Sequence, residues 1–140
     1  MVREVVAQVP RETLTAHWDY QTVLLLALGY LPEGANRLTA DSGKWNGVVC
    51  ELKEQFPEFF LEMHFAYRDP LPPHSDQLDD FFRSVGISEV LEITSPGYQV
   101  YSITDAVKIR LREKEGKFSQ EQRTAIKEMS GVMGNELIIL

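Results

Sequence analysis

The feature that most constrains this chain is a run of six apolar residues, 23–28, inside the segment 14–31. This segment reads LTAHWDYQTVLLLALGYL, which predicts a helix that ends before Pro32. From Gln21 onward the helix would be apolar on almost every side, so it cannot keep one face in water. The pattern therefore predicts a central core helix, and contact with a second copy of the chain is the alternative.

Two further segments carry the apolar stripe of an amphipathic helix. The first runs from about Asp41 to Gln55, and the second follows Ser75, which we expect to cap it, and ends at Gly86. The stripe of the second helix consists of Leu78, Phe81, Phe82 and Val85. Between these helices, residues 59–66 mix aromatic and polar side chains without helical spacing, which predicts an extended segment.

The stretch GISEVLEITSPGYQVYSITDAVKIRLRE, residues 86–113, predicts a hairpin followed at once by a helix. Its strands would lie around residues 90–93 and 98–103, joined by a turn at 95–97. The apolar fraction of 44% and the charged fraction of 25% are ordinary for a globular protein. We therefore expect a mainly helical α+β fold in a single domain of residues 1–140.

Capping residues mark the last two expected helices. Thr104 can cap a helix that runs to about Lys114. Ser119 and Gln122 have the spacing of a capping box for a final helix that reaches about Met133. The chain closes with NELIIL, an apolar tail that we expect to form a strand or to contact another subunit.

The order of these elements resembles that of winged-helix proteins. LDDFFRSVGISEV resembles the step from helix to strand in winged-helix regulators, and YSITDAVKI is similar to the step that leaves the wing in MarR and PadR regulators. The layout from Thr22 to Lys127 also resembles a group of small bacterial winged-helix proteins that includes the Panacea antitoxin domain. The resemblance implies a winged-helix-like domain with a β-hairpin wing and extra helices, and pairing of two chains through their terminal helices.

The charge of the chain disfavours nucleic acid as its partner. The formal net charge is −7, and residues 1–105 hold 7 basic against 16 acidic side chains. The helix before a wing generally enters the major groove, but here it begins SDQLDDFFRS, and carboxylates repel phosphate. The turn at 95–97 has no cation for a minor groove. Possible DNA contacts are therefore limited to the basic run Lys108, Arg110, Arg112, Lys114 and Lys117, which we interpret as a solvated helix face.

A second candidate group contains metal-ligand residue types, namely His64, Asp69, His74, Asp76, Asp79 and Asp80. Their spacing matches no established metal motif, so we expect no bound metal and no cofactor. Cys50 is followed by Glu51, which would raise a thiol pKa rather than lower it. Ser42-Gly43-Lys44 lacks the rest of a phosphate loop, and we find no other catalytic motif, so we expect no enzyme.

These observations predict a non-enzymatic protein-interaction module, cytoplasmic because a lone cysteine suits a reducing compartment and no leader or membrane segment is evident. The expected interaction surfaces are the wing and the acidic helix start, with Asp76, Asp79, Asp80 and Arg83 as the interaction face. We also expect a homodimer, because residues 23–28 and the tail 137–140 offer spare apolar surface. The alternatives are a winged-helix transcriptional regulator that binds DNA and a metal-dependent enzyme built on residues 64–80.

Overall fold

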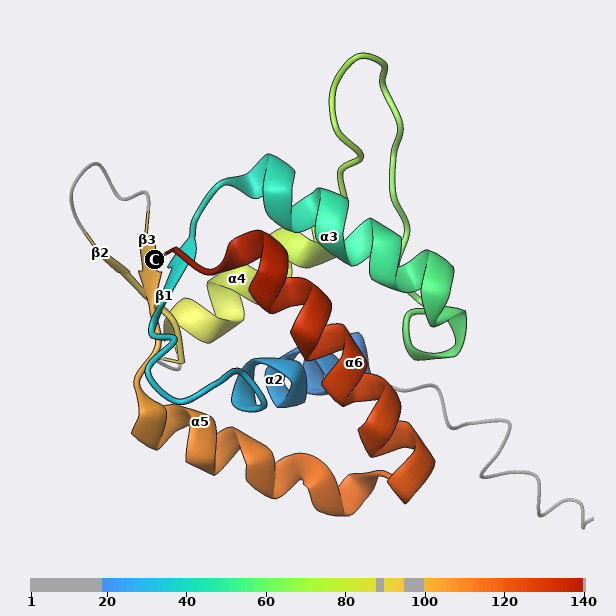
Figure 1. Cartoon of the computed structure of the whole chain (residues 1–140). Helices are drawn as coiled ribbons and strands as arrows, with labels where there is room; N and C mark the ends of the chain where they lie inside the picture. The colour runs from blue at the N-terminus through green and yellow to red at the C-terminus, as the bar shows by residue number, and fades with distance from the viewer. Residues whose placement is uncertain (1–18, 88–89, 95–99, 140) are drawn as a thin grey trace, which may run out of the picture.

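The computed structural model describes residues 19–87, 90–94 and 100–139 (Figure 1). The described helices and strands form a mainly helical α+β fold with one small antiparallel sheet, as the sequence predicts. In chain order they are α2 (Tyr20–Gly29), β1 (Arg37–Thr39), α3 (Ser42–Gln55), the 3-10 helix η1 (Pro57–Phe59), α4 (Asp76–Ile87), β2 (Glu92–Thr94), β3 (Val100–Ser102), α5 (Asp105–Arg112), the 3-10 helix η2 (Glu113–Lys117) and α6 (Gln120–Leu137).

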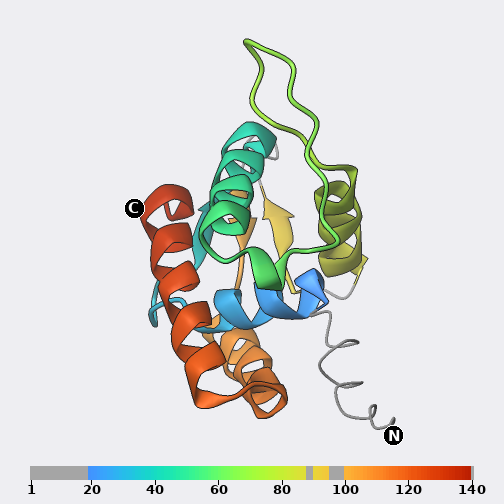
Figure 2. The same cartoon turned by 90° about the vertical axis from the view of Figure 1, so that its right-hand side faces the viewer.

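The apolar helix α2 lies at the centre of the fold, between α5 and α6 (Figures 1 and 2). Its start is capped by Asp19, whose side chain accepts a hydrogen bond from the Gln21 backbone N–H at 3.0 Å. Its side chains at 23, 24, 26, 27 and 28 are completely buried, and Leu25 is half-buried. The central position is confirmed, and the expected earlier part of the helix, 14–18 with Trp18, lies outside the described residues.

The last residue of α2 brings that helix unusually close to α5. A Cβ atom at Gly29 would lie 2.9 Å from the Cβ of Leu111 and 3.1 Å from the backbone oxygen of Lys108. Such distances are too short for a side chain, so a glycine is required where α2 crosses α5.

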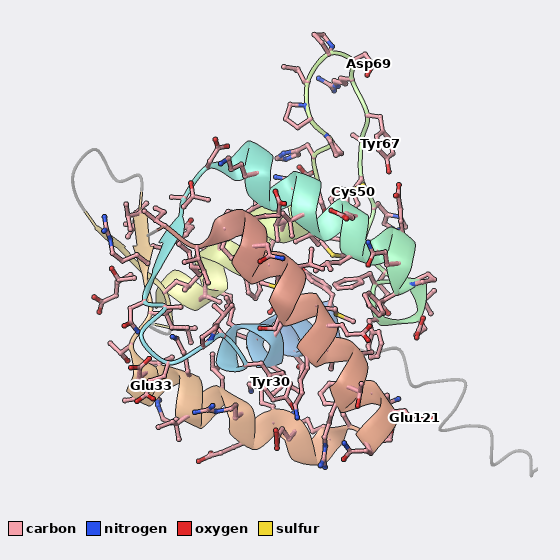
Figure 3. The ribbon with its side chains drawn as sticks, viewed as in Figure 1. Tyr30, Glu33, Cys50, Tyr67, Asp69 and Glu121 are labelled. Atoms are coloured by element: carbon pink, nitrogen blue, oxygen red, sulfur yellow. The ribbon has the colours of Figure 1, made fainter. Side chains whose placement is uncertain are left out.

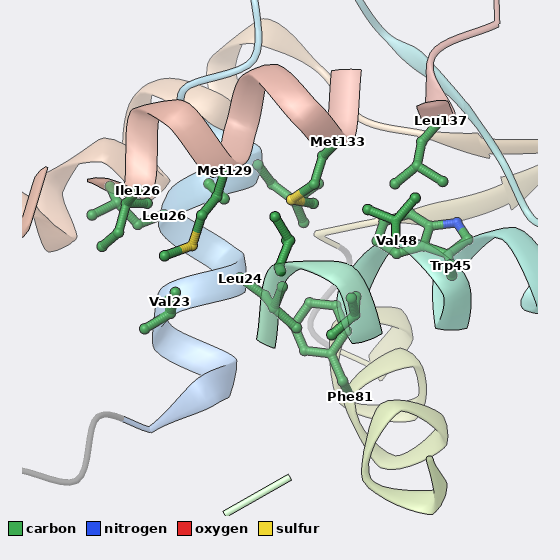
Figure 4. Packing of buried hydrophobic residues seen from close by; sticks show 14 of the residues in the cluster. Val23, Leu24, Leu26, Trp45, Val48, Phe81, Ile126, Met129, Met133 and Leu137 are labelled. Carbon is green, nitrogen blue, oxygen red and sulfur yellow. The ribbon is translucent and has the colours of Figure 1, made fainter. Parts of the chain in front are cut away.

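Helices α3 and α4 close the other side of the core. Asp41 caps α3 by accepting hydrogen bonds from the Gly43 and Lys44 backbone N–H groups, at 2.8 and 3.2 Å. Trp45 of α3 is buried, and its ring meets Phe82 of α4 edge-on with centroids 5.0 Å apart. Phe81 points into the same core, near Leu24 of α2 (Figure 4). The two predicted stripes are therefore confirmed as buried faces.

The sheet differs from its sequence prediction. Residues 59–66 are not a strand: Phe59 ends η1, both Phe59 and Phe60 are buried, and the Lys53 ammonium binds the backbone oxygens of Phe60 and Met63 at 3.1 and 2.6 Å. The third strand is instead β1, which pairs antiparallel with β3, giving the order β1-β3-β2. The predicted hairpin of β2 and β3 is confirmed by its pairing, and its turn at 95–97 lies outside the described residues.

The expected caps after the sheet are present, although the helix ends differ. Thr104 accepts from the Val107 backbone N–H at 3.1 Å, and Ser119 and Gln122 form the capping box. The α-helix after Thr104 ends at Arg112 and tightens into η2, whereas α6 extends beyond Met133 to its end at Leu137.

The C-terminal end of the chain packs against other parts of the same chain. Leu137 is buried, Ile138 bridges Leu38 of β1, and the Ile139 backbone N–H donates to the Arg37 oxygen at 3.0 Å. The tail therefore lies along the edge of β1, and Leu140 is outside the described residues. The apolar surface that motivated the expected homodimer, on α2 and at 137–139, is thus satisfied largely within one chain.

The buried side chains form one hydrophobic cluster to which α2, α3, α4 and α6 all contribute (Figure 4). None of the described helices combines the length and apolar character needed to span a bilayer.

Candidate functional site

The most prominent surface feature is the proline loop, which we define as residues 67–73. It projects from the body of the molecule between η1 and α4 (Figures 1 and 2). Two backbone hydrogen bonds between Ala66 and His74, at 2.7 and 3.0 Å, close its base. At its tip the Leu71 backbone N–H donates to the Arg68 oxygen at 2.7 Å. The loop is therefore tied at both its base and its tip.

Asn46 of α3 anchors the loop base to the core. Its side chain is 1% exposed, and its Oδ1 accepts from the Ser75 backbone N–H at 2.8 Å. Its Nδ2 donates to the backbone oxygen of Ser42 at 2.8 Å. Above this contact Pro72 rests against the first turn of α3, since a Cβ at Gly43 would lie 3.2 Å from the Pro72 Cγ. The N-terminal ends of α3 and α4 are thereby fixed relative to each other.

Gln77 of α4 fixes the chain that enters the loop. Its Oε1 accepts from the His64 backbone N–H at 2.7 Å, and its Nε2 donates to the backbone oxygen of Glu62. Its own backbone oxygen accepts from the Tyr20 hydroxyl at 2.9 Å, which connects this clamp to α2. Neither Asn46 nor Gln77 was among the residues predicted from the sequence to matter for a site, because the local sequence does not show which amide side chains will bind a distant backbone group.

Two large side chains of the loop are exposed to solvent, Tyr67 at 68% and Leu71 at 64%. The Tyr67 hydroxyl lies 3.3 Å from the Sγ of Cys50 on α3 (Figure 3). The hydrogen bond with Cys50, followed by the charge interaction with it, raises the pKa of Tyr67, so the phenol stays neutral at physiological pH. Tyr67 is thus held against α3 at its hydroxyl while most of its ring faces water.

Beneath the loop lies a hollow of about 460 Å³, bounded by α3 and the start of α4. Its walls include apolar surface from Leu71, Pro72 and Pro73, with His74 and Asp76 at one side. Because the walls belong to the anchored loop base, the hollow is present before any partner arrives.

His74 and two carboxylates meet at the start of α4. The His74 Nε2 lies 3.3 Å from an Asp76 oxygen and 3.1 Å from an Asp79 oxygen. One ligand atom from each of these residues lies within 4.8 Å of the others, so they are the members of the predicted metal group that could share an ion. All three are exposed, and polar contacts between the His74 ring and the carboxylates account for the distances without an ion.

The remaining members of that predicted group are not part of the cluster. His64 lines a separate shallow hollow with His74 and Asp76. Asp69 lies at the tip of the loop (Figure 3), and Asp80 pairs with Arg83 at 2.9 Å. The residues predicted as an interaction face, Asp76, Asp79, Asp80 and Arg83, are all exposed on α4 next to the loop base.

The predicted basic run is only partly available to a ligand. Lys108 is 2% exposed, and its ammonium binds the Pro32 backbone oxygen at 2.7 Å and Asp105 at 3.1 Å, so its prediction as a possible DNA contact is wrong. Arg110, Arg112 and Lys117 are exposed and Lys114 is half-buried. These cations lie on α5 and η2, at the opposite end of the molecule from the loop (Figures 1 and 2).

Neither protein-family models, nor curated proteins, nor solved structures give a match to this chain.

Proposed function

We propose that this chain is a non-enzymatic protein-interaction module that binds its partner through the proline loop and the adjacent acidic start of α4. The observation that carries the proposal is the exposure of Tyr67 and Leu71 on a loop that is firmly anchored. Exposed apolar side chains are common singly, but here two share one projecting loop beside a preformed hollow.

The anchoring favours binding for an entropic reason. Ordering a flexible loop on association costs free energy for each side chain and backbone unit that is fixed. Three prolines, at 70, 72 and 73, and the hydrogen bonds at the base and the tip already restrict this loop. Tyrosine is also among the residues that contribute most at interfaces, because it buries a large rigid ring and keeps a polar hydroxyl.

A winged-helix scaffold and a cytoplasmic location belong to the same proposal. The order helix, strand, helix, helix and hairpin, with the first strand beside the last in the order β1-β3-β2, supports a winged-helix arrangement with β2 and β3 as the wing. The single cysteine supports a reducing compartment. We also propose, from the sequence resemblance alone, a relationship to small bacterial winged-helix proteins, including the MarR and PadR regulators and the Panacea antitoxin group.

The proposal can be tested with loop variants in the organism that makes the protein. The chain is captured from cells in three forms: wild type, Tyr67→Ser with Leu71→Ser, and Ile109→Ser as the control. Ile109 is 57% exposed on α5, so the control removes similar apolar surface at the other end of the molecule. We expect a partner protein that wild type and control retain and the loop variant loses, with equal thermal unfolding temperatures. An unchanged set of captured proteins in the loop variant would contradict the proposal.

DNA binding is the second candidate, because Arg110, Arg112 and Lys117 are exposed on one short segment. Under the interaction proposal we expect weak duplex binding without sequence preference in a salt titration. A tight and sequence-selective complex would instead favour a regulator. In that case Arg110→Ala with Lys117→Ala would flatten the slope of affinity against salt by about two units, if both side chains contact phosphates.

A further inference from the structure

A groove of about 610 Å³ runs along α6, beside the turn that follows α2. Its lining includes Tyr30, Pro32, Lys127, Ser130, Gly131 and Ile138. A volume of this size is within the usual range for sites that take small molecules.

The groove exists because α6 carries small residues there. A Cβ atom built at Gly131 would have nothing within 4 Å, so neither packing nor a tight turn requires the glycine. Glycine is otherwise one of the least favourable residues inside a helix. At this position its effect is to leave the wall of the groove open.

A stripe of small residues is not a site by itself, but Ser130 adds an independent observation. Its side chain lines the groove, the residue is only 4% exposed, and no hydrogen bond joins its hydroxyl to any other described residue. The Ser130 hydroxyl is not among the fully enclosed side-chain atoms that lack a partner, so it keeps a small accessible area where the residue lines the groove. It therefore offers a donor and an acceptor to the groove without a hydrogen-bond partner from the described chain.

Lys127 provides a cation at the same groove. Its ammonium lies 5.3 Å from the centroid of the Tyr30 ring, and none of the described carboxylates lies within ion-pair distance of it. The Tyr30 hydroxyl is occupied, since it donates to Glu115 at 2.9 Å. Burial and this hydrogen bond raise the pKa of Tyr30 to about 12, so the ring stays neutral beside the ammonium.

We propose that this groove binds a small amphipathic carboxylate. The apolar part of the ligand lies against the Tyr30 ring, Pro32 and Ile138. The carboxylate accepts hydrogen bonds from the Lys127 ammonium and the Ser130 hydroxyl. The groove matches such a ligand in both charge and polarity. Within the described part of the chain it has a cation without a carboxylate partner, a hydroxyl without a hydrogen-bond partner and apolar walls, which suit an anion with a short hydrocarbon body.

The test uses benzoate, phenylacetate and octanoate, each beside its uncharged amide, and follows binding by calorimetry and by amide chemical shifts. At least one carboxylate should bind with a Kd of about 1 mM or tighter, which is reasonable for ligands of this size. Its amide should bind at least about tenfold more weakly. Shift changes should centre on residues 127–134 of α6.

Variants locate the site. Gly131→Leu fills the groove and should abolish binding, and Lys127→Gln should weaken it about tenfold. Gly47→Leu is the matched control, because Gly47 is also a helical glycine whose added Cβ would meet nothing within 4 Å, and it lies on α3 outside the groove. The proposal is overturned if none of the three carboxylates binds, if an amide binds as well as its acid, or if Gly131→Leu binds normally. The loop variant Tyr67→Ser with Leu71→Ser should bind the carboxylate normally, so the outcome is independent of the proposed interaction function.

Discussion

Three donors converge on one carboxylate oxygen of Asp105. They are the backbone N–H of Gly34, the side-chain amide of Asn36 and the ammonium of Lys108, each 3.1 Å away. These hydrogen bonds, with that of Gly34 as the largest contribution, hold the pKa of Asp105 below its usual value. Gly34 itself has a φ of +86°, a conformation that favours glycine, so the loop after α2 is shaped to reach this carboxylate.

Replacing Asp105 with asparagine should therefore destabilise the protein in a pH-dependent way. Because the folded pKa is depressed, the stabilisation is fully present above the unfolded pKa, near 4, and is lost as pH falls through the folded pKa. Chemical denaturation of wild type and Asp105→Asn should show a clear gap at pH 7 that narrows below about pH 4. A gap of constant size from pH 7 to pH 3 would mean that the charge of Asp105 is not what stabilises this loop.

Alanine substitutions at Ser75 and Asn46 should have different effects on the free energy of unfolding, although the two residues are in contact. The Ser75 hydroxyl is buried without a hydrogen-bond partner among the described residues, whereas the Asn46 amide makes three hydrogen bonds. Ser75→Ala should leave the free energy of unfolding unchanged or raise it, because no hydrogen bond is lost. Asn46→Ala should lower it by about 1–3 kcal/mol, because the buried Ser75 N–H loses its acceptor. Equal losses in the two variants would show that Ser75 has a partner such as a buried water.

Single residues show where sequence reasoning fails. Lysine is almost always exposed, so Lys108 was grouped with its basic neighbours. Its burial depends on the Pro32 oxygen, which comes from a residue 76 positions earlier. No local sequence pattern predicts such a long-range contact. The contacts of Asn46 and Gln77 at the base of the proline loop are equally invisible in the local sequence.

At the scale of elements, prediction succeeded where one periodic pattern determines one buried face. The helices at 42–55 and 76–87 are correct because their apolar stripes lie within the segments themselves. The cap expected from Ser75 is wrong, because its hydroxyl is buried and makes no hydrogen bond to the first turn of α4. The extended segment predicted at 59–66 is wrong because consecutive aromatic residues are typical of extended chain, although here they fill a compact turn whose backbone oxygens bind Lys53. The true strand β1 has three residues and forms only because β3 lies beside it, so its own sequence carries little signal.

The stripe of α4 can be tested at its most buried position. Phe81 is fully buried against the core, so Phe81→Ala should lower the free energy of unfolding by about 3–5 kcal/mol. Phe82 on the same helix is only half-buried, and Phe82→Ala should cost less. A smaller loss at Phe81 than at Phe82 in denaturant titrations would contradict the orientation of α4.

At the scale of the whole molecule, the C-terminal residues pack along the edge of strand β1, and this contact leads to a prediction about assembly. Deleting residues 138–140 removes the bridge between Ile138 and Leu38 and the hydrogen bond from Ile139, so the unfolding temperature should fall by several degrees. The two apolar surfaces that supported the predicted homodimer contact the rest of the same chain. The oligomeric state that light scattering measures for the wild type should therefore be the same after this deletion. A dimer that dissociates on truncation would place the tail in an interface after all.

The proposed function can also be examined at this scale, because its two candidate surfaces lie at opposite ends of the molecule (Figures 1 and 2). The proline loop carries exposed apolar side chains beside carboxylates, whereas α5 and η2 carry the exposed members of the basic run, Arg110, Arg112 and Lys117. A protein partner and a nucleic acid would therefore meet different ends of the fold, and a position-specific probe can distinguish them.

The most direct measurement is photo-crosslinking in living cells, with a photoreactive phenylalanine analogue placed at Leu71 in one form and at Ile109 in another. Both positions are exposed, at 64% and 57%, so the probe should disturb the fold at neither. The interaction account predicts a covalent adduct with one protein from position 71 and none from position 109. An adduct with nucleic acid from position 109, and no protein adduct from position 71, would contradict it.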